Sequence, residues 1–523
     1  MKRIVVFLLL LIAVSLLTLG CEIKPEQLMF PENIQINGRI LTWDPVENAS
    51  SYTVTVGGES VQTQECRLEL YTQTADGGTY HIDIAANGDE VNYTVSARAR
   101  IAAEFDPAVQ EGMDESGYTF VLLEDKSGYE INRGVAKLDG HIVLPDFFNG
   151  YPVTRIARCM FYYAAALPDY SMETNCNTVT TGITLPAHLK EIGEYAFACM
   201  VRLEEIIIPE GVEILDHYTF LGCTHLTNVV LPQGLRSIRT GCFNNTALRE
   251  IVLPDSLEYI SDRAFSKSFF KISTDGEYTY YQTIKSGLTS VIIPASVKYI
   301  GEEAFYGQLD LQEIVFEDIQ NVEIIDRKAL YETAWYAQQP DGIIWLGNML
   351  YAYKGKLPAD STVEIPGNAI VCGGAFARQQ NLKKVIIHTG AQLVGQGIFQ
   401  DCKFLSEVVI HEGLQQIPSY TFAETDSLTS ITLPEGISEI GDFAFMSSGL
   451  RQIVLPASLK KVSGFSGAVT HIFCKGTPEQ VKEYGPLYKI KENHYFYSET
   501  KPTEPGNYWR YVDGIPTPWE TEE

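Results

Sequence analysis

The stretch LTNVVLPQGLRSIRTGCF, residues 226–243, decides the fold. Its first part alternates as a strand does, with Val229 and Leu231 on one side and Asn228 and Val230 on the other. Pro232 then ends the strand, because proline has no backbone N–H to offer a neighbouring strand. We therefore expect a short strand with an apolar inner side and an outer side that faces solvent.

The second part of the same stretch turns back toward the interior. Leu235 and Ile238 point inward again, and Phe243 fills the far side of the coil. One such turn cannot bury these side chains alone, whereas stacked turns bury them against one another. The stretch thus predicts one turn of a solenoid in which each turn adds one short parallel strand.

Two markers repeat this turn along the chain. An apolar residue followed by proline recurs, and the copies from Pro186 to Pro254 lie 23, 23 and 22 residues apart. Glu317, His388 and His411 occupy the proline position in turns that lack it. The second marker is a phenylalanine that recurs in phase with the first, at Phe197, Phe220, Phe243, Phe265, Phe305, Phe376, Phe399, Phe422 and Phe445.

Written as L-x-x-I-x-L-P-x-x-L-x-x-I-x-x-x-A-F-x-x-C, the repeat resembles the BspA-type leucine-rich repeats of bacterial surface proteins. Ile192-Gly193, Ile300-Gly301 and Ile440-Gly441 match the Ile-Gly step of that family. The resemblance covers residues 118–476. It implies a leucine-rich repeat solenoid, a right-handed superhelix of strands and turns with a repeat of about 23 residues, and a non-catalytic binding role.

Three turns depart from the period. Pro145 and Pro186 lie 41 residues apart, Pro254 and Pro294 lie 40 apart, and Glu317 and Pro366 lie 49 apart. Each of these turns holds an insertion. In the third, residues 345–353 predict a β-hairpin.

The segment 25–103 alternates with period two and has no helical stretch. It resembles a fibronectin type III sandwich, with Trp43 as the core aromatic, Tyr52 on the next strand and Tyr80 in the place of the tyrosine corner. The resemblance implies a spacer or docking module. The polar, acidic residues 104–117 predict a linker to the repeats.

The first residues of the sequence predict that the protein is exported from the cytoplasm. Lys2 and Arg3 precede the apolar run 4–19, and Gly20-Cys21 follows, so residues 1–20 are predicted to be a signal peptide. The leader resembles that of bacterial lipoproteins, in which the cysteine is lipidated; Thr18 departs from the leucine usual there. We expect lipidation at Cys21 and a membrane contact only through this anchor, with an ordinary secretory signal as the alternative.

Residues 477–523 predict a C-terminal cap. Thr477-Pro478 opens a capped helix, and Asp513-Gly514 suggests a hairpin turn. The aromatic residues around both are expected to cover the last turn of the solenoid, with a sugar-binding face as the alternative. We expect Trp519 and the residues after it to be frayed.

Composition and motifs exclude several functions. The net charge of −27 argues against nucleic acid, because phosphate binding needs clustered Lys and Arg. The nine histidines show no metal-ligand spacing, although His388 and His411 are expected to stack on adjacent turns. Cys199, Cys223 and Cys402 each follow a repeated phenylalanine by two or three residues and are expected to be buried thiols at a recurring core position, and Cys159 could pair with Cys176. We expect no catalytic residue, metal or cofactor.

The outward side of the strands carries the candidate binding residues. One outward column is polar and the next is Val or Ile in eight of nine well-aligned repeats. The central members of the two columns are Asn228, Val230, Glu250, Val252, Ser290, Ile292, Glu313 and Val315. An apolar stripe that faces solvent is typical of a protein-binding face. Strand propensity alone also favours β-branched residues there, and this alternative stays open.

The expected role is therefore that of an adhesin-like protein of the cell surface. Its partners would be surface or matrix proteins of a host or a neighbouring cell, or glycans. The alternatives are a carbohydrate-binding or carbohydrate-processing surface protein that uses the inserted hairpin and the cap, and a structural component of the envelope.

Overall fold

The computed structural model describes residues 25–89, 92–162, 176–267, 269–272, 278–281, 287–463, 469–482, 494–504 and 506–519. The predicted leader and Cys21 lie outside these residues. The chain divides into two compact units. The first comprises residues up to 137 together with 145–155, and the second comprises 138–144 and everything from 156 onward. Among the described residues, no helix has the length and apolarity needed to cross a bilayer.

The first unit contains a small all-β domain. A three-stranded antiparallel sheet has the order β2-β3-β6, and a four-stranded one has the order β5-β4-β7-β9. The strands are β2 (Gln35–Asn37), β3 (Ile40–Thr42), β4 (Ser51–Val56), β5 (Glu59–Thr63), β6 (Arg67–Glu69), β7 (Gly78–Asn87) and β9 (Ala99–Phe105), and the short pair β1 (Glu26–Gln27) and β8 (Tyr93–Thr94) runs parallel beside them.

The two sheets share one core. Leu41 of β3 and Val54 and Ile84 of the larger sheet are fully buried in it. Trp43 packs edge-on against Tyr52, with ring centroids 5.3 Å apart. The hydroxyl of Tyr52 accepts a hydrogen bond from the backbone N–H of Val46 (2.8 Å). A bond from a tyrosine hydroxyl to nearby backbone defines a tyrosine corner, the role that we predicted for Tyr80. The ring of Tyr80 instead packs edge-on against Phe105.

The segment 104–117 is more ordered than a linker. Strand β9 continues to Phe105, and β10 (Glu111–Met113) pairs with β11 (Thr119–Leu122). The rest of this part of the first unit consists of β12 (Tyr129–Asn132), β14 (Phe147–Phe148) and β15 (Tyr151–Ile156). The first unit thus includes the start of the region 118–476 that we assigned to the repeats, because backbone pairing and the buried Tyr129 and Tyr151 tie it to the preceding strands.

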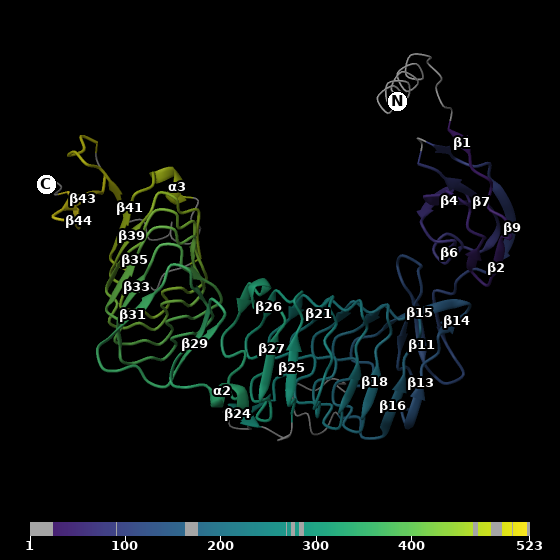
Figure 1. The fold of residues 1–523 in the computed structure, drawn as a ribbon, viewed down its shortest axis with the longest axis horizontal. Coiled ribbons are helices and arrows are strands. Elements are labelled where there is room, and N and C mark those ends of the chain that lie inside the picture. Colours follow the sequence, from purple (N-terminus) through teal and green to yellow (C-terminus); the bar gives the residue numbers. More distant parts are fainter. Residues whose placement is uncertain are drawn as a thin grey trace, which may run out of the picture. The chain divides into compact units, whose positions relative to one another are not determined.

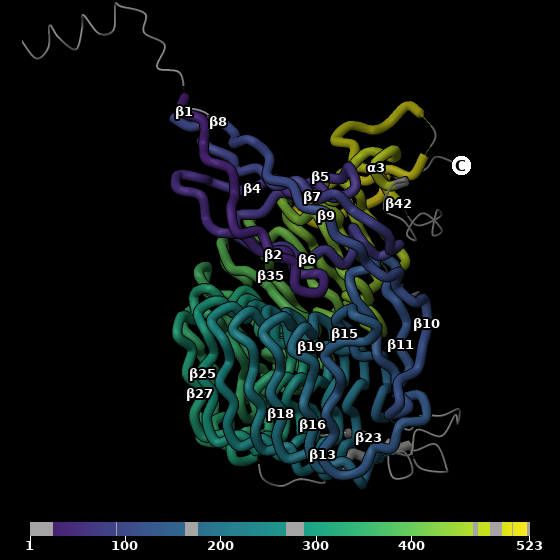
Figure 2. The backbone as a smooth tube through the Cα atoms, turned by 90° about the vertical axis from the view of Figure 1, so that its right-hand side faces the viewer, coloured from purple at the N-terminus to yellow at the C-terminus, as the bar shows by residue number. Residues whose placement is uncertain are grey.

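The second unit is the predicted solenoid, whose coils the tube in Figure 2 traces. Most turns contribute a strand before the proline position, and these strands form the front ladder, in which labelled members such as β16, β18, β25 and β27 follow one another in Figure 1. The front ladder comprises β13 (Gly140–Val143), β16 (Thr180–Thr184), β18 (Glu205–Ile207), β20 (Asn228–Val230), β25 (Ser290–Ile293), β27 (Glu313–Phe316), β31 (Ser361–Ile365), β33 (Leu382–Ile387), β35 (Glu407–Ile410), β37 (Ser430–Thr432), β39 (Gln452–Leu455) and β41 (His471–Cys474).

A second set of strands, each of two residues, follows the proline position of each turn and forms the back ladder. Its pairs are also parallel and in register, for example Leu215 with Ile238 and Ile238 with Ile260. It comprises β17 (Glu191–Ile192), β19 (Ile214–Leu215), β21 (Ser237–Ile238), β22 (Tyr259–Ile260), β26 (Tyr299–Ile300), β28 (Ile324–Ile325), β32 (Ile370–Val371), β34 (Gln392–Leu393), β36 (Gln416–Ile417), β38 (Glu439–Ile440) and β40 (Lys461–Val462).

The repeated phenylalanines stack into an aromatic ladder inside the coil. Phe220 lies 5.3 Å from both Phe197 and Phe243, with the rings nearly parallel. The residue two positions before the phenylalanine adopts a left-handed backbone in turn after turn, as at Tyr195 (φ 57°) and Tyr218 (φ 57°). This conformation costs a non-glycine residue energy, and the hydrogen bonds between turns offset the cost.

The third insertion interrupts the ladder. It contains the 3₁₀ turn η2 (Ile319–Asn321), helix α2 (Ala334–Gln338) and the antiparallel hairpin β29 (Gly342–Leu346) and β30 (Met349–Lys354), which confirms the predicted hairpin. Strand β30 also pairs in parallel with β32, so the hairpin joins the back ladder. The second insertion contains the antiparallel pair β23 (Phe269–Ile272) and β24 (Tyr278–Tyr281).

The C-terminal residues continue the front ladder. Helix α3 (Pro478–Lys482) follows Thr477, whose N–H donates to the side chain of Gln480 (2.8 Å). Strands β42 (His494–Tyr497) and β43 (Tyr508–Val512) add to β41 in parallel, and β44 (Ile515–Pro518) returns. The two-residue turn Asp513-Gly514 has positive φ at both positions, as predicted.

Trp519 is held in place, and the expectation that it is frayed is wrong. Its indole N–H donates to the carbonyl of Ser498 (3.0 Å), and its ring lies 3.7 Å from the guanidinium carbon of Arg510.

Candidate functional site

An apolar stripe runs along the outward side of the front ladder. Its members are five side chains from consecutive turns whose exposed fractions are large for Val or Ile: Ile207 (69%), Val230 (48%), Val252 (82%), Ile292 (57%) and Val315 (40%). Ile207 pairs directly with Val230, and Ile292 with Val315, so these members are direct neighbours along the ladder. The inner neighbours Ile206 and Val229 are buried, as period two requires.

A polar column borders the stripe. Glu205, Asn228, Glu250, Ser290 and Glu313 are all exposed and lie two residues before the corresponding stripe member. Glu250 and Val252 lie in a segment that is not assigned as a strand. The backbone N–H of Thr289 in the next turn still donates to the carbonyl of Arg249 (3.1 Å). All eight residues predicted as ligand-binding therefore lie on one outward side of neighbouring turns.

The stripe is confined to the first part of the solenoid. Ile386 and Val409 occupy the same column but are half-buried. Val454 belongs to the same column, all of which we expected to face solvent, yet it is only 2% exposed, because Phe473 and Trp509 pack over it. At the other end the column reaches Val143, which is 66% exposed. We did not predict this member, although it directly precedes the Leu144-Pro145 marker, as the other stripe members precede theirs.

His388 and His411 stack as predicted, with centroids 5.4 Å apart and rings 6° from parallel. The Nε2 atom of His388 lies 3.2 Å from the carboxylate of Glu364. Within the described ranges, no group of three or more His, Cys, Asp or Glu side chains comes together as a metal site would require. The two rings lie one turn apart at the proline position, directly after strands β33 and β35.

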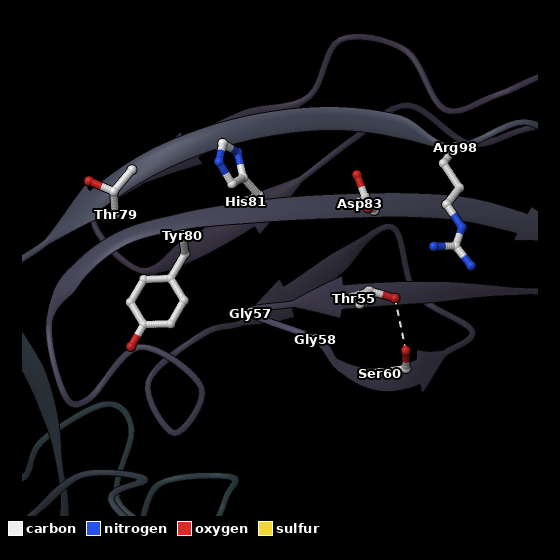
Figure 3. A pocket seen from close by; sticks show the side chains of 9 residues that line it. All are labelled: Thr55, Gly57, Gly58, Ser60, Thr79, Tyr80, His81, Asp83 and Arg98. Atoms are coloured by element: carbon white, nitrogen blue, oxygen red, sulfur yellow. Dashed lines mark hydrogen bonds between the residues drawn. The ribbon is translucent and has the colours of Figure 1, made fainter.

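A hollow on the small β-domain, shown in Figure 3, is lined by Thr55, Gly57, Gly58, Ser60, Thr79, Tyr80, His81, Asp83 and Arg98. Thr55 and Ser60 bond to each other across it (2.8 Å). Asp83 binds Arg100 with two hydrogen bonds (2.6 and 2.8 Å), and these bonds hold the pKa of its carboxyl below the ordinary value. Asp83 therefore stays ionised and paired with Arg100, and it contributes polar surface to the hollow.

A second hollow of about 330 Å³ lies near the third insertion, and its charged groups neutralise one another. Arg327 binds Glu302 and donates to the side chain of Gln400 (2.9 Å). Lys328 lies 3.4 Å from Glu303. These ion pairs join neighbouring turns. Because Arg327 and Lys328 are both paired, neither is available to recognise an anionic ligand.

Comparison with known proteins agrees with the repeat geometry. A family model described as the BspA type leucine rich repeat region matches residues 153–271, 273–357 and 349–466, which is more than half of the chain. No curated protein sequence matches.

Several solved structures are similar. A leucine rich cell surface protein of Faecalibacterium prausnitzii is 23% identical; the match covers 72% of this chain and 97% of that one, with a TM-score of 0.34. A leucine-rich repeat protein of Bacteroides ovatus is also 23% identical, covering 73% and 98%, with a TM-score of 0.33. The pneumococcal vaccine antigen PcpA is 18% identical, covering 74% and 94%, with a TM-score of 0.33. On the family match, this chain belongs to the BspA-type leucine-rich repeat proteins.

Proposed function

We propose that this chain is a non-catalytic, adhesin-like binding protein of the cell surface, and that its apolar stripe engages protein ligands. The observation that carries the proposal is the exposure of five Val and Ile side chains in consecutive turns, from Ile207 to Val315. Contiguous apolar surface of this kind costs solubility unless a partner covers it. The partners would be surface or matrix proteins of a host or a neighbouring cell.

The other parts of the chain have roles that fit this proposal. Cys21 would carry a lipid anchor and hold the protein at the membrane. The small β-domain, with three strands in one sheet and four in the other, would be a fibronectin type III-like spacer that carries the solenoid away from that membrane. Several weak contacts along the rigid ladder would add up to the affinity.

The test is binding of host and bacterial surface proteins to residues 22–523, with each captured protein identified and its affinity measured. The triple variant V230D/V252D/I292D should weaken binding at least about tenfold, because each charge would be desolvated against an apolar partner surface. Phe404→Asp is the matched control, since Phe404 is 63% exposed and lies outside the stripe. An unchanged affinity of the triple variant, with an unchanged unfolding midpoint, would remove the stripe from the proposal.

Carbohydrate binding is the second candidate. The side chains that favour it are partly exposed aromatic rings: Trp345 of the inserted hairpin (42%) and Tyr497 and Tyr511 of the C-terminal strands (44% and 39%). A glycan array probed with residues 22–523 and with Trp345→Ala separates the two. Glycan binding that depends on Trp345 and ignores the triple variant would favour this candidate.

A further inference from the structure

Two cysteines meet where the chain re-enters the repeat frame at the first insertion. Asn177 and Met200 form a parallel bridge, the N–H of Asn177 donates to the carbonyl of Cys199 (2.9 Å), and the N–H of Val201 donates back to Asn177 (3.2 Å). These bonds place Cys176 and Cys199 at equivalent positions of adjacent turns. Neighbouring strands lie about 4.8 Å apart, within the range of Cα separations of about 4.4–6.8 Å that a disulfide spans.

The two thiols are neighbours across this bridge. The side chains of Cys176 and Cys199 form a hydrogen bond with each other. Cys199 is buried at 1% exposure, while Cys176 remains half-buried and open to a reagent. None of the nine cysteines among the described residues, Cys159 included, is part of a disulfide in this structure.

Cys199 also differs from the other buried cysteines of the repeat. Cys223 and Cys402 lie three residues after a phenylalanine, and each Sγ donates to the carbonyl of the phenylalanine one turn earlier, Phe197 and Phe376 (both 3.1 Å). Burial raises the pKa of these two thiols to about 12, so they are inert. Cys199 lies two residues after its phenylalanine and faces a sulfur instead of a carbonyl.

We propose that Cys176 and Cys199 form a disulfide that staples two adjacent turns at the end of the first insertion. The bond requires an oxidant, which would be another disulfide, either that of a thiol–disulfide oxidoreductase or oxidised glutathione. The proposal rests on the proposed function, in which the chain is exported to the cell surface. Disulfides persist in such oxidising compartments.

The chemistry follows from the asymmetry of the pair. The hydrogen bond from Cys199 lowers the pKa of the Cys176 thiol, which makes Cys176 the first nucleophile. Its thiolate attacks the disulfide of the oxidant and releases one thiolate, so a mixed disulfide forms. Cys199 then loses its proton and attacks Sγ of Cys176, which releases the second thiolate. The two cysteines lose two electrons and two protons, and the oxidant becomes two thiols.

The test is a thiol count and a peptide map of residues 22–523. After treatment with oxidised glutathione and denaturation, seven of the nine cysteines should react with a maleimide, and a disulfide-linked peptide should join Cys176 to Cys199. The thermal midpoint should rise by about 3 °C or more on oxidation and fall back in dithiothreitol. Cys176→Ser should abolish both effects, whereas Cys223→Ser should keep the linked peptide.

Nine reactive thiols after oxidation, or a linked peptide that joins Cys176 to any other cysteine, would overturn the proposal. The outcome is independent of the ligand-binding test. The disulfide is read by mass, and the triple variant V230D/V252D/I292D should form it normally even if the stripe binds nothing.

Discussion

At the scale of single residues, each ring of the aromatic ladder makes a large contribution to stability that one substitution can remove. Phe220 is fully buried between two parallel rings, each 5.3 Å away. Phe220→Ala should lower the free energy of unfolding by about 3–5 kcal/mol, because the neighbouring turns cannot close the cavity without breaking their own hydrogen bonds. Urea unfolding followed by circular dichroism measures this, with the exposed Phe404→Ala as the control that should change it by less than about 0.5 kcal/mol. Equal effects of the two variants would contradict the packing argument.

A buried lysine should give the second unit an unusual dependence on pH. Lys267 is 1% exposed, and its ammonium group donates to the carbonyl of Thr246. Burial lowers its pKa from 10.5 to about 8, against the opposing effect of Asp310. The unfolded chain therefore binds the proton more tightly than the native state, and stability rises with pH between about 8 and 10.5.

The penalty of the buried charge is fully present below pH 8 and amounts to about 3 kcal/mol at most. Lys267→Met should reduce this rise, which thermal unfolding at pH 7.5 and pH 9.5 would detect. Lys461→Met is the control, because Lys461 is exposed and its pKa is raised by Glu439. A rise with pH that survives in Lys267→Met would assign it to other groups.

At the scale of elements, the third insertion replaces a backbone contact with a side chain. In intact turns the N–H of the ladder phenylalanine donates to a carbonyl of the next turn, as Phe305 does to Ala329 (2.8 Å). Leu330 occupies the next ladder position, and its N–H donates instead to the hydroxyl of Tyr351 (2.7 Å), a residue of β30 that is 1% exposed. The hairpin thereby supplies the acceptor that the missing regular turn would have provided.

Tyr351→Phe should keep the packing but leave the N–H of Leu330 buried without this acceptor. We expect a loss of about 1–3 kcal/mol in the free energy of unfolding, and faster hydrogen exchange at Leu330 in particular. Tyr353→Phe is the matched control in the same strand. Unchanged exchange at Leu330 would mean that water or a backbone shift satisfies the group.

The features that the sequence predicts are the ones that local spacing determines. The proline and phenylalanine markers, the helix after Thr477 and the Asp513-Gly514 turn each depend on a few neighbouring residues, and the structure contains all of them. The contacts that were missed join residues distant in sequence. Trp519 is tied to Ser498, Val454 is covered by Trp509, and Cys176 meets Cys199 only because an insertion returns the chain to register. No local pattern encodes these pairings.

At the scale of the whole second unit, a solenoid is stabilised mainly by contacts between nearest turns, so damage at one end should stay near that end. The C-terminal strands allow a direct test. Trp509 is fully buried, its indole N–H donates to the carbonyl of Cys474 (3.1 Å), and its ring packs against Phe473 and Val454. It therefore closes the last turns against solvent.

Trp509→Ala should lower the local stability of the last turns by about 3–5 kcal/mol, since a large buried ring is lost. Hydrogen exchange followed by mass spectrometry should show faster exchange in peptides from β39 and β41 and unchanged exchange in peptides from β18 and β20. Ile515→Ala, at a 65% exposed position of β44, is the control that should leave both regions alone. If protection fell equally throughout the second unit, the turns would unfold as a single cooperative block, and the first turns that carry the apolar stripe would depend on the C-terminal strands for their stability.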